Sequence, residues 1–241
     1  MSDTGRLERE PLRQPAARTL RPTTAPDLLF DLDGTLTDNF TGIAASIRHA
    51  LARLSAAPPD DAALRHCVGP PLRATFARLL STSDSATIER AIVHYRERFA
   101  EVGWRENVPY PGIDEALHAL HGAGARLYVC TAKPQVYAER IVAHFGLARF
   151  FRGVFGADLA GRFDDKATLM AHLLAQEGVA AAGASMIGDR GHDIRAARAN
   201  GVRAVAAHWG YGSDEELADA DAHVAVPGDL PRALLADQSS A

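Results

Sequence analysis

Between residues 111 and 226 the sequence alternates short apolar runs with longer amphipathic stretches. The apolar runs predict strands, and the stretches between them, with apolar residues every three or four positions, predict helices. Repeated strand–helix units of this length form a parallel sheet covered by helices on both faces. We therefore expect a doubly wound α/β fold with its active site at the carboxyl ends of the strands. The predicted strands are 126–130, 153–157, 184–188, 203–206 and 222–226, and the predicted helices are 113–121, 134–145, 166–177 and 191–199.

A first strand precedes this region, and a block of helices separates the two. The run Leu28–Phe30 is apolar and ends in acids and a glycine, as expected where a buried strand gives way to a loop. Residues 41–105 then carry only helical patterns, up to the prolines and glycine of 109–112, which predict a hinge or linker. We expect a catalytic core at 26–40 and 111–238, a helical insert at 41–110 and a disordered tail at 1–25.

The overall composition excludes several classes of function. At 47% apolar and 23% charged residues, the 241-residue chain can bury a sizeable core. The net charge of −4 argues against nucleic-acid and membrane-surface partners. The sequence has no apolar run of membrane-spanning length, no signal peptide, and only two cysteines, Cys67 and Cys130. We expect a soluble cytoplasmic protein whose oligomeric state is open.

The choice of cationic residues is more informative than their number. Of the 26 cationic side chains, 24 are arginine, and the two lysines are Lys133 and Lys166. Because arginine serves as the general surface cation here, a retained lysine indicates chemistry that needs a compact ammonium instead of a planar guanidinium.

Polar side chains gather where the predicted strands end. Because these ends meet at one edge of a parallel sheet, the side chains should converge. Several carboxylates so placed repel one another unless a divalent cation binds, and Mg²⁺ suits carboxylate, carbonyl and phosphate oxygens. The converging residues are Asp31 and Asp33, Thr131 and Lys133, Asp189 and Asp193, together with Lys166 at the start of a predicted helix.

These residues carry a resemblance to a known family. Asp31-Leu32-Asp33-Gly34-Thr35, then Thr131, Lys166 and the stretch 188–193 resemble, in order, the four motifs of the haloacid dehalogenase superfamily. The helical insert resembles a C1-type cap. Segments 68–72, 188–194 and 199–201 are similar to the phosphoglycolate phosphatase-like branch, some of whose members resemble 5'-nucleotidases.

The resemblance and the chemistry of the residues assign the same roles to the polar side chains. Asp31 is the expected nucleophile, which forms an aspartyl-phosphate. Asp33 is expected to protonate the leaving alcohol and then to deprotonate the attacking water. Thr131 is expected to donate a hydrogen bond to a phosphoryl oxygen, and Lys166 to neutralise developing charge.

The remaining acids are expected to serve the metal. Asp189 should bind Mg²⁺ beside Asp31 and the carbonyl of Asp33, while Asp193 orients Lys166 or a metal-bound water. For Lys133 the sequence leaves two possibilities open, a role at the site or a solvent-exposed side chain. His192 is expected to be a loop residue without a catalytic role.

The leading hypothesis is a Mg²⁺-dependent phosphomonoesterase that acts on a small phosphorylated metabolite. A phosphosugar mutase and a non-enzymatic phospho-accepting module are the alternatives. In the insert, Gly69 and Arg73 belong to a loop expected to contact the substrate, where arginine suits a carboxylate. Our first choice of substrate is 2-phosphoglycolate, with a nucleoside monophosphate as the alternative.

Overall fold

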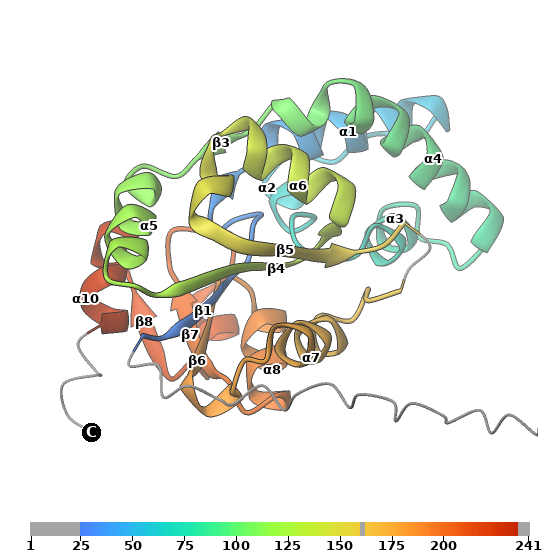
Figure 1. Ribbon diagram of the computed structural model, residues 1–241. Coiled ribbons are helices and arrows are strands. Elements are labelled where there is room, and N and C mark those ends of the chain that lie inside the picture. Colours follow the sequence, from blue (N-terminus) through green and yellow to red (C-terminus); the bar gives the residue numbers. More distant parts are fainter. Residues whose placement is uncertain (1–24, 160–161, 236–241) are drawn as a thin grey trace, which may run out of the picture.

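The computed structural model describes residues 25–159 and 162–235, so the predicted tail lies almost wholly outside it. Its main sheet has six strands in the order β5-β4-β1-β6-β7-β8, and every neighbouring pair is parallel. The predicted parallel α/β fold is therefore confirmed (Figure 1). The strands are β1 Asp27–Phe30, β4 Arg126–Pro134, β5 Phe151–Ala157, β6 Ala184–Gly188, β7 Arg203–Ala207 and β8 Ala222–Val224.

Two hydrophobic clusters cover the two faces of this sheet. One is built with helices α5, α6 and α10, and the other with α7 and α8, so the sheet is doubly wound. Each predicted core helix is present with its bounds shifted by one residue at most. The helices are α5 Ile113–Gly122, α6 Gln135–His144, α7 Lys166–Glu177, α8 Gly191–Ala199, α9 Asp214–Leu217 and α10 Leu230–Leu235, and 3-10 turns span Gly103–Arg105, Leu147–Phe150, Ala181–Gly183 and Pro227–Asp229.

Residues 40–101 form four helices around a third hydrophobic cluster. Asp60 and Asp84 cap two of them, each side-chain oxygen accepting a backbone N–H of the first turn. The short second helix was not predicted, because five residues are too few for a periodic pattern. These helices are α1 Phe40–Arg53, α2 Asp61–Arg65, α3 Leu72–Leu79 and α4 Ser85–Glu101.

The chain crosses between the core and the insert through two short segments that pair with each other. Strand β2, Thr37–Asp38, lies antiparallel to β3, Val108–Pro109. The predicted linker at 109–112 thus begins in a two-stranded ribbon. Among the described residues no helix has the length and apolarity needed to cross a membrane.

Candidate active site

The predicted catalytic residues lie at the carboxyl end of the central strands. Asp31 directly follows β1, and its backbone N–H donates to Ile187 O of the adjacent β6 at 2.9 Å. Asp189 directly follows β6. Thr131 lies within β4, which runs four residues further than predicted and changes register between Thr131 and Pro134. The structure therefore gathers these polar side chains at one edge of the sheet, as parallel topology requires.

Lys166 lies between two acids. It is the first residue of α7, whose N-cap Asp165 accepts the N–H of Thr168. Its Nζ lies 2.9 Å from Asp31 Oδ1 and forms an ion pair with Asp193, and its side chain is 3% exposed. Burial alone would lower the pKa of Lys166, but the two carboxylates raise it. The ammonium therefore stays charged where a phosphoryl group would meet Asp31.

The same ion pair keeps Asp31 ionised. Burial alone would raise the pKa of Asp31, but the charge of Lys166, the charge of His192 and the hydrogen bonds from Lys166 and the Leu32 N–H together lower it. An ionised carboxylate is the form that can attack phosphorus.

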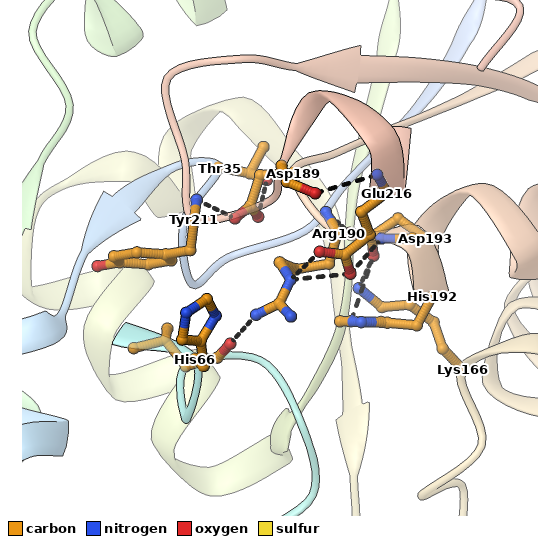
Figure 2. A network of polar contacts seen from close by, with 12 residues as sticks. Thr35, His66, Lys166, Asp189, Arg190, His192, Asp193, Tyr211 and Glu216 are labelled. Carbon is orange, nitrogen blue, oxygen red and sulfur yellow. Dashed lines mark hydrogen bonds and ion pairs between the residues drawn. The ribbon is translucent and has the colours of Figure 1, made fainter. Parts of the chain in front are cut away.

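Asp189 is completely buried, and neighbouring backbone packs closely against it. Its Oδ1 accepts from Thr35 Oγ1 and its Oδ2 from the backbone N–H of Tyr211, both at 2.9 Å (Figure 2). A Cβ on Gly34 would lie only 2.2 Å from the same carboxylate. Burial, followed by the charges of Asp31 and Asp193, raises the pKa of Asp189. The acid is therefore held rigidly in a place where negative charge is in excess.

The excess of carboxylates over cations fits a divalent metal ion. Asp31, His192 and Asp193 also bring potential ligand atoms within 4.8 Å of one another. However, the Lys166 ammonium already lies between Asp31 and Asp193 and offsets one of their two negative charges. Asp189 is not paired with Lys166, and its oxygens, with those of Asp31, are the hard donors that Mg²⁺ prefers.

The Lys133 side chain is buried in the site. Its Nζ forms an ion pair with Asp33, its side chain is 5% exposed, and it lies 4.9 Å from the ring centroid of Phe99 in the insert. The backbone N–H of Lys133 donates to Thr131 Oγ1 at 3.2 Å. The possibility that Lys133 only faces solvent is therefore wrong, because the irregular end of β4 turns it inward.

Asp193 and His192 belong to the first turn of α8, so His192 is not in a loop as expected. Asp193 Oδ2 accepts the backbone N–H of Arg190 at 2.9 Å, while its Oδ1 contacts Lys166. Asp193 thus contacts Lys166, one of the two groups that it was predicted to orient, and the orienting role stays a prediction. Burial lowers the pKa of His192.

A cavity of about 90 Å³ opens beside Asp33 and Lys133. The rings of Tyr95 and Phe99 stack at 5.4 Å in its wall, and Tyr137 meets Phe99 edge-on at 5.2 Å. The sequence suggested no aromatic group near a substrate, because Tyr95 and Phe99 fit the apolar face of α4 and Tyr137 stands on α6.

The two residues predicted to contact the substrate from the insert lie in different places. Gly69 lines the cavity, and its φ of +99° favours glycine. Arg73 lies outside it, in an ion pair with Glu89, and lines a separate outer groove of about 530 Å³. Pro71, Leu72 and Arg96 line both hollows, so the two adjoin.

One segment was missed by sequence reasoning. Residues 209–212, which follow β7, pack directly on the Asp189 carboxylate. The signal available was the pair of glycines, Gly210 and Gly212, at the carboxyl end of a core strand. A Cβ on either would lie within 2.3 Å of an Asp189 atom.

Comparison with known proteins now identifies the family. The model of the haloacid dehalogenase-like hydrolases matches residues 28–207, which run from β1 to the end of β7 and include every site residue that the sequence predicted. The chain belongs to this family. The predicted family and the predicted enzyme class, a phosphoric monoester hydrolase, are both confirmed.

Individual relatives carry different names. A 5'-nucleotidase of Pseudomonas aeruginosa is 47% identical over 192 residues, which cover 80% of this chain and 86% of that protein. The tyrosine-protein kinase PtkA of Mycobacterium tuberculosis is 39% identical, and the match covers 90% of this chain and 75% of that protein. A phosphoglycolate phosphatase of Pseudomonas putida is 32% identical, and the match covers 90% of this chain and 81% of that protein. The crystal structure of a predicted phosphatase from Clostridium acetobutylicum has a TM-score of 0.84 at 34% identity and covers 88% of this chain and 99% of its own.

Proposed function

We propose that the protein is a Mg²⁺-dependent phosphomonoesterase that forms an aspartyl-phosphate on Asp31. The observation that carries the proposal is the buried Lys166 ammonium 2.9 Å from Asp31 and paired with Asp193. This arrangement keeps a carboxylate ionised and places a positive charge beside it, as in-line attack on a phosphoryl group requires.

The remaining residues supply the proton transfers and the contacts to the phosphoryl group. Asp31 attacks phosphorus, and the bond between phosphorus and the leaving oxygen breaks. Asp33 in its protonated form gives the proton to that oxygen; as the resulting carboxylate, the form that pairs with Lys133, it later takes a proton from the water that hydrolyses the aspartyl-phosphate. The Thr131 hydroxyl and the Lys166 ammonium stabilise the phosphoryl oxygens.

Asp31, Asp189 and the backbone carbonyl of Asp33 would hold the Mg²⁺. When bound, the ion would supply positive charge against the phosphoryl oxygens. Its charge would also offset the burial and the repulsion from Asp31 and Asp193 that together raise the pKa of Asp189. Thr35 and Tyr211, which hold the Asp189 oxygens, fix the direction in which this ligand points.

For the substrate we propose a nucleoside monophosphate. The names of the relatives differ, so family membership supports the phosphoryl chemistry without selecting the leaving group. The aromatic wall of the cavity favours a leaving group with extended apolar faces, which a sugar–base unit has. The cavity is small, but the adjoining outer groove extends it past Leu72 and Arg96, where a base could lie.

A second candidate is 2-phosphoglycolate, the substrate that the sequence favoured. The volume of about 90 Å³ suits a small leaving group. The Nε of Arg96 is buried in the wall without a hydrogen-bond partner and could bind a carboxylate. Arg96, on α4, would then fill the role predicted for Arg73.

Phosphate release from both substrates tests the two candidates. If the substrate is a nucleoside monophosphate, Phe99→Leu lowers its kcat/KM about tenfold more than that for 2-phosphoglycolate, the value of one stacked ring. The loss of the Phe99 contact with Lys133 affects both substrates alike. The matched control is Phe76→Leu, because Phe76 is buried in the same cluster but does not line the cavity.

The two candidates predict different effects of the Arg96→Gln substitution on phosphate release. If Arg96→Gln abolishes activity on 2-phosphoglycolate and 2-phosphoglycolate is the faster substrate, the second candidate is correct. Activity on neither substrate would refute both substrate assignments, and no turnover of a nitrophenyl phosphate either would refute the proposed phosphatase chemistry.

A further inference from the structure

Tyr211 contacts the candidate metal ligand at one end and the connections to the insert at the other. Its backbone N–H donates to Asp189 Oδ2 at 2.9 Å. Its ring points away from that carboxylate (Figure 2) and packs against the hydrophobic cluster of the insert. Its hydroxyl donates to Asp38 Oδ1 at 2.5 Å. One residue, through its backbone N–H and its hydroxyl, thus joins parts of the molecule that are far apart in sequence.

The Tyr211 hydroxyl contacts the first of the two segments that connect the core with the insert, and the second segment pairs with the first. Asp38 belongs to the first segment, as the last residue of β2 before α1. Tyr110 belongs to the second segment, directly after β3, and its backbone N–H donates to Leu36 O, just before β2, at 3.1 Å. The ladder between Thr37–Asp38 and Val108–Pro109 joins the same two segments. Any movement of the insert relative to the core would therefore change the hydrogen bond between this hydroxyl and Asp38.

The segment that carries Tyr211 has little freedom to move independently of Asp189. The Trp209 indole donates to Thr35 O at 2.9 Å, and Thr35 itself donates to Asp189. A Cβ on Gly210 would lie 2.3 Å from Asp189 Cβ and 2.4 Å from Gly34 O. A displacement of Tyr211 must therefore shift Asp189 or break these contacts.

We propose that Tyr211 is a positioning residue that couples the position of the insert to that of the Asp189 carboxylate. The proposal rests on the assignment of Asp189 as a Mg²⁺ ligand under the proposed function. Because such coupling is reciprocal, Mg²⁺ at Asp189 stabilises the connecting segments, and ordered connecting segments strengthen Mg²⁺ binding. Tyr211 itself touches neither substrate nor metal in this scheme.

The test is hydrogen exchange of the full chain, read by mass spectrometry with and without Mg²⁺. In the unmodified protein, Mg²⁺ slows exchange in peptides covering 36–40 and 107–112. In Tyr211→Phe this Mg²⁺-dependent slowing is lost, and the Kd for Mg²⁺, measured by calorimetry, rises about 3- to 10-fold. The control is Tyr128→Phe, which removes a buried hydroxyl without a hydrogen-bond partner and leaves both measurements unchanged.

Each outcome decides between the two proposals. If Tyr211→Phe keeps the full Mg²⁺ effect, or if Mg²⁺ binds without slowing exchange in the unmodified protein, the coupling is wrong and the phosphatase assignment stands. If Mg²⁺ neither binds nor supports phosphate release, the metal assignment fails and the coupling fails with it. A purely structural Tyr211 would show faster exchange in the variant but the same response to Mg²⁺.

Discussion

Replacing Lys166 with arginine should remove most of the activity although the charge is kept. The Lys166 side chain is 3% exposed and lies between Asp31 and Asp193. Arginine adds about two non-hydrogen atoms and spreads its charge over a planar group. Inserting such a group into a filled site costs about 1–3 kcal/mol, and displacing the charge from the phosphoryl oxygens lowers kcat by about 10²–10³-fold. The ammonium is therefore needed for its shape as well as its charge.

Initial rates of phosphate release at saturating substrate and Mg²⁺ measure this loss. Lys166→Met is the matched comparison, because it keeps an unbranched chain and removes only the charge. Losing one partner of a buried ion pair costs about 3–5 kcal/mol, so the methionine variant should be at least as inactive and should melt lower. Turnover by Lys166→Arg within about threefold of the unmodified rate would refute the argument, since it would make shape irrelevant.

Three further predictions concern the metal, a glycine and an ion pair. A chelator should abolish phosphate release and added Mg²⁺ should restore it, whereas Ca²⁺, with its larger and looser shell, should not; full turnover in excess chelator would contradict the metal site. Gly210→Ala should lower kcat about 10- to 100-fold by displacing Asp189, while Gly122→Ala, whose Cβ meets no atom within 4 Å, should be neutral. Arg98 donates to both oxygens of Glu106 at 2.7 and 2.9 Å and so lowers the pKa of Glu106. This pair stabilises the fold above the usual carboxyl pKa, and its contribution disappears as the pH falls through the lowered value. In chemical denaturation Glu106→Gln should therefore cost about 1 kcal/mol at pH 7 and nothing at pH 2; an equal cost at both pH values would refute this assignment.

The sequence was sufficient to predict the core of the fold. Alternating apolar runs and helical patterns located every strand of the main sheet, because buried parallel strands are continuously apolar. The boundaries that differ have local causes. Strand β4 continues to Pro134 through a register irregularity, and β5 starts at Phe151, next to a 3-10 turn.

The convergence of polar residues was predictable for a related reason. Asp31 and Asp189 end neighbouring strands, so parallel topology alone places them together. Arginine usage further indicated that Lys133 and Lys166 are special, and both are buried against acids.

Features that depend on packing between distant segments were not predictable. Tyr95 and Phe99 have the spacing of core residues, and no local signal distinguishes a ring that faces a cavity from one that fills a core. Tyr211 joins Asp189 and Asp38 across more than twenty and more than one hundred and seventy residues of sequence. Such contacts exist only once the chain has folded.

The central claim is that Asp31 becomes phosphorylated and that Asp33 is needed to release the phosphate. With a nitrophenyl phosphate the leaving group needs little protonation, so the Asp33→Asn variant should still transfer the phosphoryl group to Asp31. It should then stall, because the water that cleaves the aspartyl-phosphate has lost its base.

Rapid-mixing kinetics combined with mass spectrometry of the protein tests this claim directly. For Asp33→Asn the account predicts a burst approaching one equivalent of nitrophenol, a slow phase, and one added phosphoryl group on the peptide that contains Asp31. Asp31→Asn should give neither burst nor adduct. Linear turnover of Asp33→Asn at the unmodified rate, or a burst from Asp31→Asn, would contradict the mechanism.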